Sequence, residues 1–146
     1  MNPTIDILLG PRQLAVVGAS TDTHSFGSIV YRELKQRGFT LTPVNPRYDE
    51  VDGDKCYKSL TDLTTKVESA LFVLAANAAV SAVAEAHAAG IKYIWFQQMA
   101  DYSAAARAAE EAGIETVSRK CILMYAQPVA GFHGFHRFVN RIVGRL

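Results

Sequence analysis

A glycine-ended apolar run near the start of the chain has the composition of a phosphate-binding turn. Residues 14–30 read LAVVGASTDTHSFGSIV, with Gly18 ending a strand-like run and Gly27 opening a helical pattern. The backbone N–H groups and the dipole at the start of a helix favour a phosphate there. The dinucleotide fingerprint would continue with two more glycines, but this chain has Ser20 and Thr23.

This loop alone leaves two interpretations open. Its hydroxyl groups can donate hydrogen bonds to a phosphate, or Gly18 can serve only a tight turn within a solvated polar loop. The hydroxyl donors are Ser20, Thr21, Thr23 and Ser25. The choice between the two depends on the residues at the end of the next apolar run.

The end of the second apolar run separates the nucleotide classes. An NAD site places Asp or Glu there, about 20 residues after the glycines, to bind the ribose hydroxyls. Here the run ends in Val44-Asn45-Pro46-Arg47, without a carboxylate and with a cation directly after it. Arginine pairs bidentately with phosphate, so the pattern favours coenzyme A, with its 3′-phosphate, or NADP, with its 2′-phosphate. Taken by itself, Arg47 is also compatible with an ordinary surface arginine.

The elements that position these residues alternate regularly along the chain. Apolar runs that end in turn signals predict strands, and helical patterns lie between them. The strands are predicted at residues 13–18, 39–44, 69–75, 92–97 and 114–117. We expect one α/β domain over residues 1–146, Rossmann-like and doubly wound, with a mainly parallel five-stranded sheet and helices on both faces. Such sheets bind ligands at the carboxyl ends of their strands.

Capping residues and apolar spacing predict the helices. Residues 27–37 form the first, Ser59 caps a short one, and Asn77 and Ser103 cap two longer ones. The helix after Asn77 is predicted to bury Val80, Val83 and Ala84.

The last segment, residues 132–146, is predicted to form an amphipathic helix. Its Arg137, Arg141 and Arg145 are four residues apart and form one basic stripe. This stripe is a solvated face or a contact for an acidic partner or for ligand phosphates. The apolar face packs on its own domain, in a homodimer or against another protein, and the sequence does not choose among these.

The motifs occur in an order that resembles a known family. AVVGAS at 15–20, PVNPRY at 43–48 and Gly-x-x-x-Tyr-x-Ser-Leu at 53–60 resemble the small stand-alone CoA-binding proteins. These are similar to the nucleotide-binding domain of succinyl-CoA synthetase α subunits. The resemblance continues through YIWFQ to Cys121 and covers residues 12–124.

This resemblance implies a ligand, coenzyme A or an acyl-CoA, and a position for it. The turn after the first strand would lie by the pyrophosphate, the Asn-Pro-Arg segment near the adenosine, and the segment after the third strand along the remaining edge. Together with the hydroxyl donors of the loop, the predicted cofactor-binding residues are Gly18, Ala19, Ser20, Thr23, Ser25, Asn45, Pro46, Arg47, Ala75, Ala76 and Asn77.

Three departures from the family pattern fall on the pantetheine side of this site. The Phe-Arg found after the third strand in many relatives lacks its arginine here. The family's Trp-x-Gln-x-Gly becomes Trp95-Phe96-Gln97-Gln98-Met99, without the glycine. The family's Asp-Arg-Cys becomes Arg119-Lys120-Cys121, which replaces an acid by a cation. We expect Trp95 and Phe96 in the core and Gln97 and Gln98 toward the cleft.

Composition excludes several other classes of protein. The net charge of +1 gives no bias toward nucleic acid or membrane, and no run is long enough to span a bilayer. Cys56 and Cys121 form no disulfide framework and no metal-ligand spacing, so we expect a cytoplasmic protein without a metal. His133 and His136 have a possible metal spacing but no partner ligands nearby in sequence. Cys121, beside two cations, is a reactive thiol or, as we expect, a buried inert one.

The residues suggest no catalytic constellation, so no catalytic residue is predicted. The phosphorylated histidine and ATP-grasp parts of succinyl-CoA synthetases lie outside the resemblance. The leading hypothesis is therefore a CoA or acyl-CoA binding protein that acts as a sensor, carrier or partner subunit. The alternatives are a small NADP-dependent oxidoreductase or other nucleotide-binding enzyme, and an interaction protein with a vestigial pocket.

Overall fold

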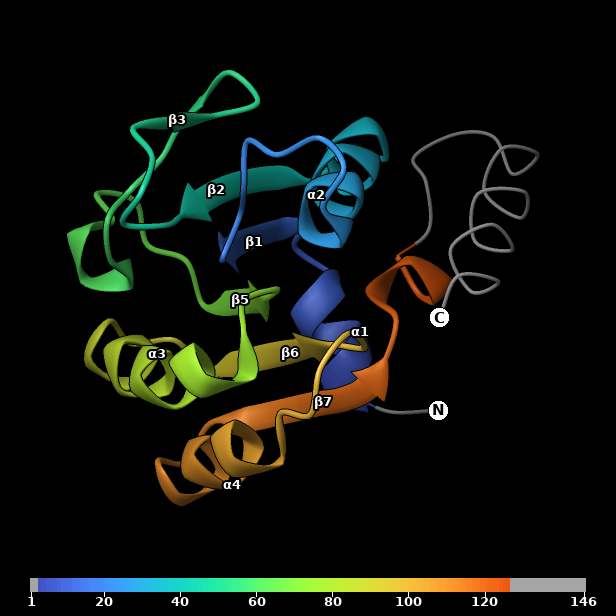
Figure 1. Cartoon of the computed structure of the whole chain (residues 1–146). Coiled ribbons are helices and arrows are strands. Elements are labelled where there is room, and N and C mark those ends of the chain that lie inside the picture. Colours follow the sequence, from blue (N-terminus) through green and yellow to red (C-terminus); the bar gives the residue numbers. More distant parts are fainter. Residues whose placement is uncertain (1–2, 127–146) are drawn as a thin grey trace.

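A parallel sheet of five strands forms the centre of the computed structural model, which describes residues 3–126 (Figure 1). The sheet order is β2-β1-β5-β6-β7, and every neighbouring pair is parallel. The strands are β1 (Gln13–Val17), β2 (Thr40–Val44), β5 (Ser69–Phe72), β6 (Tyr93–Gln97) and β7 (Glu115–Lys120). From β1 the chain first adds β2 on one side and then β5, β6 and β7 on the other. The strand order therefore reverses at β1. Ligands of such sheets bind at this crossover, outside the carboxyl ends of the strands.

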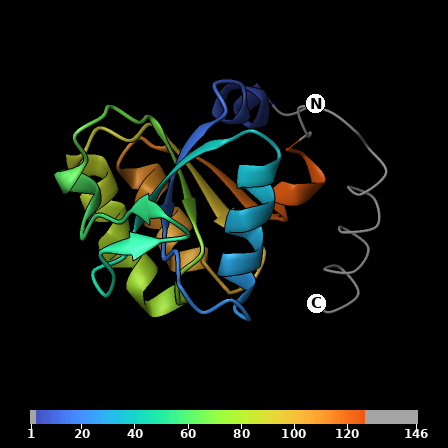
Figure 2. The same ribbon diagram turned by 90° about the horizontal axis from the view of Figure 1, so that it is seen from above.

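Helices cover both faces of the sheet, as Figure 2 shows from above. The helices are α1 (Pro3–Leu9), α2 (Phe26–Gln36), α3 (Ala76–Ala88) and α4 (Ser103–Glu111), with 3₁₀ turns η1 (Leu60–Asp62) and η2 (Ile122–Met124). Strand side chains alternate between two cores. Leu71 and Trp95 pack with α1, α2 and η2, whereas Phe72 and Phe96 pack with α3 and α4. The predicted doubly wound α/β fold is therefore confirmed.

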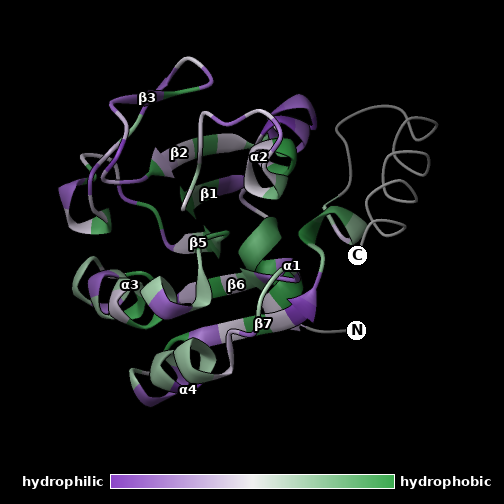
Figure 3. Ribbon diagram, in the orientation of Figure 1, coloured by the Kyte–Doolittle hydropathy of each residue, from purple (hydrophilic) through white to green (hydrophobic). Residues whose placement is uncertain are grey.

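Two elements were not predicted from the sequence. One is α1, whose Ile5, Leu8 and Leu9 are buried against the sheet. The other is a two-stranded antiparallel ribbon of β3 (Glu50–Val51) and β4 (Asp54–Lys55), in a stretch that reads as an acidic turn. Figure 3 shows that hydrophilic residues dominate this ribbon, so it carries almost no hydrophobic signal.

Several predicted boundaries are wrong. The third strand ends at Phe72 instead of residue 75, because the chain then turns past the end of β1. The last strand continues to Lys120 instead of residue 117. It is an edge strand, and its outer residues are polar.

The two longer helices begin differently from the prediction. Asn77 is not a cap, because α3 begins at Ala76 after an Ala75 that makes no side-chain capping bond. Ser103 is the first helical residue of α4 rather than its cap, and its N–H is accepted by the Asp101 carboxylate at 3.0 Å. Ser59 does cap η1, since its hydroxyl accepts the Thr61 N–H.

The predicted buried face of α3 is also largely wrong. Val83 is buried, but Val80 and Ala84 are exposed. The buried residues of this helix are Ala79, Ala82, Val83 and Ala86. An alanine-rich helix has no contrasting periodicity, so its sequence does not show which face packs on the sheet. The predicted helix at 132–146, with its arginine stripe, lies outside the described residues.

A cluster of polar contacts holds the β3–β4 ribbon against α2. The Tyr31 hydroxyl donates to Oδ2 of Asp54 at 2.5 Å. Lys35 Nζ lies 3.1 Å from the same oxygen and 3.3 Å from Oδ2 of Asp52. Burial, and then the Asp54 carboxylate, raise the pKa of the Tyr31 phenol.

Replacing Tyr31 by phenylalanine should lower the free energy of unfolding by about 1 kcal/mol at neutral pH, because it removes this hydrogen bond. A raised phenol pKa in the folded state means that the unfolded chain loses this proton first. The free energy of unfolding of the wild type should therefore fall as the pH rises past about 10. In Tyr31→Phe this free energy should fall less over the same pH range, because the phenol is absent. Urea titrations of both proteins across this pH range measure the difference. Identical pH dependence in the two proteins would contradict the assignment.

Candidate functional site

The crossover of the sheet holds a cavity of about 830 Å³. Its walls come from the ends of β1 and β2, the turn after β5, and one side of α3. Six predicted site residues line it: Gly18, Ser20, Asn45, Pro46, Arg47 and Ala75. The structure thus brings together segments that are far apart in sequence, at the edge of the sheet where the topology places ligands.

Gly18 allows the end of β1 to pass directly against the turn after β5. Its φ is +98°, and its N–H donates to the Val44 carbonyl at 2.9 Å. A Cβ on this residue would lie 2.7 Å from Cβ and 2.8 Å from the backbone N of Leu74. Both the backbone conformation and the available space therefore require glycine.

The loop after Gly18 is held by its own side chains. Asp22 N–H donates to the Ser20 hydroxyl at 3.0 Å. Ser25 caps α2, accepting the Ser28 N–H at 3.1 Å and donating to the Asp22 carbonyl at 2.9 Å. These bonds close the loop between Ser20 and the start of α2.

The remaining predicted residues lie outside the cavity lining. Thr23 is exposed in the loop, and Ser25 serves as the helix cap. Ala19 is fully buried, with its carbonyl accepting from Asn45. Ala76 and Asn77 lie in the first turn of α3.

Asn45 ties the loop after β1 to the loop after β2. Its Nδ2 donates to the Ala19 carbonyl at 2.9 Å, and its Oδ1 accepts the Arg47 N–H at 2.9 Å. Its own N–H donates to the Tyr57 carbonyl at 2.9 Å. Pro46 keeps the preceding residue out of helical conformations, which suits this arrangement. Asn45 therefore fixes where Arg47 leaves the sheet.

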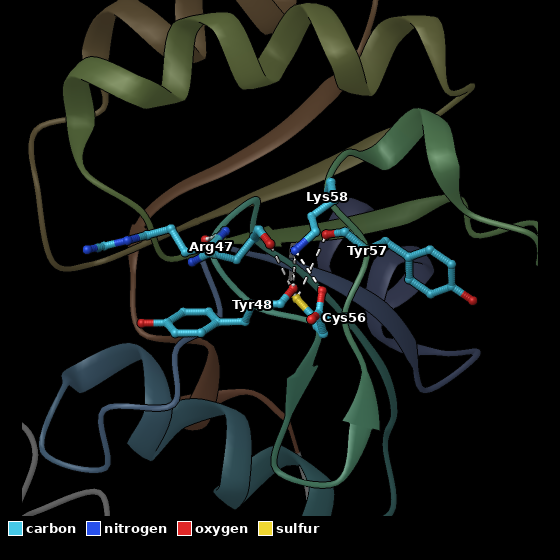
Figure 4. Close-up of polar contacts among 7 residues, drawn as sticks. Arg47, Tyr48, Cys56, Tyr57 and Lys58 are labelled. Carbon is cyan, nitrogen blue, oxygen red and sulfur yellow. Dashed lines mark hydrogen bonds and ion pairs between the residues drawn. The ribbon is translucent and has the colours of Figure 1, made fainter.

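Arg47 and Tyr48 extend side by side from this loop, as Figure 4 shows. The Tyr48 and Ser20 hydroxyl oxygens lie 3.5 Å apart. Hydrogen bonds from Ser20 and Thr21, with a smaller effect of the Arg47 charge, lower the pKa of the Tyr48 phenol. Hydroxyl groups and a guanidinium thus meet at one end of the cavity, which suits an anion.

Five of the eight polar residues in the lining are not among the predicted site residues. The added residues include Tyr48, Lys58, Ser59, Ser81 and Glu85. The Lys58 ammonium donates to the Tyr48 carbonyl at 3.0 Å and to Oδ1 of Asp49 at 2.9 Å, which holds the loop (Figure 4). The Ser59 hydroxyl donates to Glu85, joining η1 to α3. Tyr48 and Ser59 lie in the quoted motifs, but no local signal marks Ser81 or Glu85.

Both cysteines are buried. Cys56 Sγ lies 3.6 Å from the Asn45 carbonyl, and burial raises the pKa of this thiol. Cys121 accepts a hydrogen bond from Nε2 of Gln97 at 3.1 Å, and Oε1 of Gln97 accepts the Ile122 N–H at 2.9 Å. Cys121 therefore matches the buried interpretation. Gln97 is fully buried and does not face the cleft, contrary to the prediction.

Within residues 3–126 no group of three or more His, Cys, Asp or Glu side chains is placed to hold a metal ion. No helix in this range is long and apolar enough to cross a bilayer.

The chain is similar to a family of CoA binding domains and to part of longer CoA ligases. A family model described as "CoA binding domain" matches residues 12–127. The α subunit of an ADP-forming acetate–CoA ligase II from Pyrococcus furiosus is 35% identical over 89 residues, which are 60% of this chain and 20% of that subunit. The chain thus spans about a fifth or less of the curated relatives it matches.

Two solved structures, one of similar size and one much longer, also match. A hypothetical protein from Pyrococcus horikoshii OT3 is 34% identical, with a TM-score of 0.75 over 81% of this chain and 84% of that one. The apo form of a dinucleotide-forming acetyl-coenzyme A synthetase 1 from Ca. Korarchaeum cryptofilum is 27% identical, with a TM-score of 0.66. That match covers 77% of this chain and 27% of the synthetase chain.

Gly18→Ala should lower the free energy of unfolding by about 3 kcal/mol, from backbone strain plus overlap with Leu74. Gly53→Ala is the matched control, because Gly53 has a φ of +81° but open space around its Cβ position. It should lose only about 1 kcal/mol. Denaturant titration of both variants measures these losses, and equal losses would show that the contact with Leu74 adds nothing.

Proposed function

Because the chain belongs to the CoA binding domain family, we propose that it binds coenzyme A or an acyl-CoA in the cavity at the crossover of the sheet. The observation that carries this proposal is the position of Arg47. It lines the same cavity as Gly18 and Ser20, and Asn45 fixes its backbone at the end of β2. That strand end is where an NAD site would have a carboxylate.

The CoA pyrophosphate lies by Gly18 and Ser20, near the N-terminus of α2. Glycine allows a close backbone approach there, and the positive end of the helix dipole favours negative charge. The Ser20 and Tyr48 hydroxyls supply hydrogen-bond donors at the same point.

The adenosine 3′-phosphate is held by Arg47, whose guanidinium can form two parallel hydrogen bonds with phosphate oxygens. The adenosine itself lies between the Asn45–Tyr48 loop and α3, whose Ala78 and Ala82 give the cavity an apolar wall. Two cations, Arg47 and Lys58, and one carboxylate, Glu85, line this described cavity. Lys58 is paired with Asp49, so Arg47 supplies the charge that favours a phosphorylated ribose over an unphosphorylated one.

The proposed role is binding rather than chemistry on the ligand. Two of the relatives named above, the acetate–CoA ligase subunit and the acetyl-coenzyme A synthetase, are far longer than this chain, which spans 20% and 27% of their lengths. We infer a sensor, a carrier or a subunit that presents CoA to a partner.

Isothermal titration with CoA and dephospho-CoA tests the proposal. The wild type should bind CoA about tenfold more tightly than dephospho-CoA, because the 3′-phosphate pairs with Arg47. Arg47→Gln should reduce the affinity for CoA to that for dephospho-CoA. Lys66→Gln is the control, because this lysine is exposed and outside the lining, and it should change neither the affinity for CoA nor that for dephospho-CoA.

Equal binding of the two ligands by the wild type would remove the role of Arg47. Absence of CoA binding would overturn the proposed function. Tighter binding of NADPH than of CoA would favour the oxidoreductase alternative instead.

A further inference from the structure

A second cavity, of about 390 Å³, lies at the carboxyl ends of β6 and β7 beside α4. Its lining is mostly polar and includes Ser103, Arg107, Ser118 and Arg119. Phe96 and Tyr102 form its apolar floor, with ring centroids 5.4 Å apart. None of these residues lines the proposed CoA cavity.

The backbone is strained where β7 meets this cavity. Trp95 pairs with Val117 and Gln97 with Lys120, so two residues of β7, Ser118 and Arg119, oppose a single residue of β6. This is a β-bulge, a feature that re-aims side chains and is common beside functional sites. Arg119 has a φ of +62°, which is unfavourable for any residue with a Cβ.

Contacts after the bulge keep it in place. Trp95 Nε1 donates to the Lys120 carbonyl at 2.9 Å, and buried Gln97 holds both Cys121 and the Ile122 N–H. Strain that the surroundings enforce is typical of sites where a side chain must have one position. Here the side chain is an arginine at the cavity wall, at the position where the family pattern has an acid.

A hydrogen bond joins a residue that lines the second cavity to a residue that lines the first. Tyr102 lines the second cavity, and its hydroxyl donates to the carbonyl of Leu74, which lines the first. The sheet order places the second cavity two to three strands beyond β1, or about 10–14 Å away at the usual strand spacing. An extended pantetheine arm that begins at Gly18 can cross this distance along the strand ends.

We propose that this second cavity receives the acyl end of a bound acyl-CoA and that Arg119 selects acyl groups that end in a carboxylate. The inference rests on the proposed function. Arg119 and Arg107 supply the cations, and the Ser118 hydroxyl supplies a further donor. Of the two acids in the lining, Asp101 accepts hydrogen bonds from Ser103 and also interacts electrostatically with Arg119, so a bound carboxylate must compete with it. Glu110 lies one turn along α4 from Arg107.

Titration with glutaryl-CoA and valeryl-CoA tests this selection, since both acyl groups have five carbons and only glutaryl ends in a carboxylate. The wild type should bind glutaryl-CoA about fivefold more tightly, the upper range for an exposed ion pair. Arg119→Gly should lose the preference while binding free CoA as the wild type does. Its melting temperature should not fall, because glycine adopts this φ without strain. Arg119→Lys should keep part of the preference.

Three results would overturn the inference. Equal binding of the two thioesters by the wild type would remove the selection. A preference that persists in Arg119→Gly would remove Arg119 from it. A preference lost equally in Arg119→Lys and Arg119→Gly would show that positive charge at this position is not what selects. Failure of the wild type to bind free CoA is a separate outcome, which overturns the proposed function and this inference with it.

Discussion

The close approach of Gly18 to Leu74 is the constraint on which the rest of the site depends. Because Gly18 has no side chain, the end of β1 passes against the turn after β5, and the crossover of the sheet becomes a narrow, continuous edge. The Gly18 N–H holds the end of β2 through Val44, and the Val73 N–H holds β1 through Val17. Tyr102 then reaches the Leu74 carbonyl from the far side. The loops after β1, β2 and β5 and both cavities are thus arranged around the contact of Gly18 with Leu74, which leaves no room for a Cβ on Gly18.

The features that could be predicted from sequence are those written in local patterns. Buried strands ending in turn residues, and the unusual Asn45–Arg47 segment, indicate the fold and the ligand class because each depends on neighbouring residues. The buried face of α3 could not be predicted, because the helix is rich in alanine. Its sequence therefore does not show that Ala79 is buried whereas Val80 is exposed. Ser81 and Glu85 reach the cavity only because the sheet order brings α3 to it. The bulge at Arg119 depends on how β7 pairs with β6, which no local pattern encodes.

The two ends of the proposed ligand meet different kinds of protein surface. At the nucleotide end, Ser20 is held by a hydrogen bond within its own loop, and Asn45 by one to the loop after β1, so the site is preorganised before any ligand arrives. At the acyl end, the strained backbone at Arg119 is held by contacts of Lys120, Cys121 and Ile122, the next residues along the chain. Of the departures from the family pattern, the arginine missing after β5 falls at the first cavity, whereas Arg119 lines the second. Affinity for the CoA nucleotide and choice of the acyl group are then separate properties of separate residues.

A crystal structure of the protein with bound CoA would show whether the nucleotide lies in the cavity at the crossover of the sheet. We expect the pyrophosphate beside Gly18 and Ser20, with 3′-phosphate oxygens within hydrogen-bond distance of the Arg47 guanidinium. We also expect the pantetheine arm to run past Leu74 toward β6. A CoA molecule bound elsewhere on the chain, or bound here with its 3′-phosphate turned away from Arg47, would contradict the account.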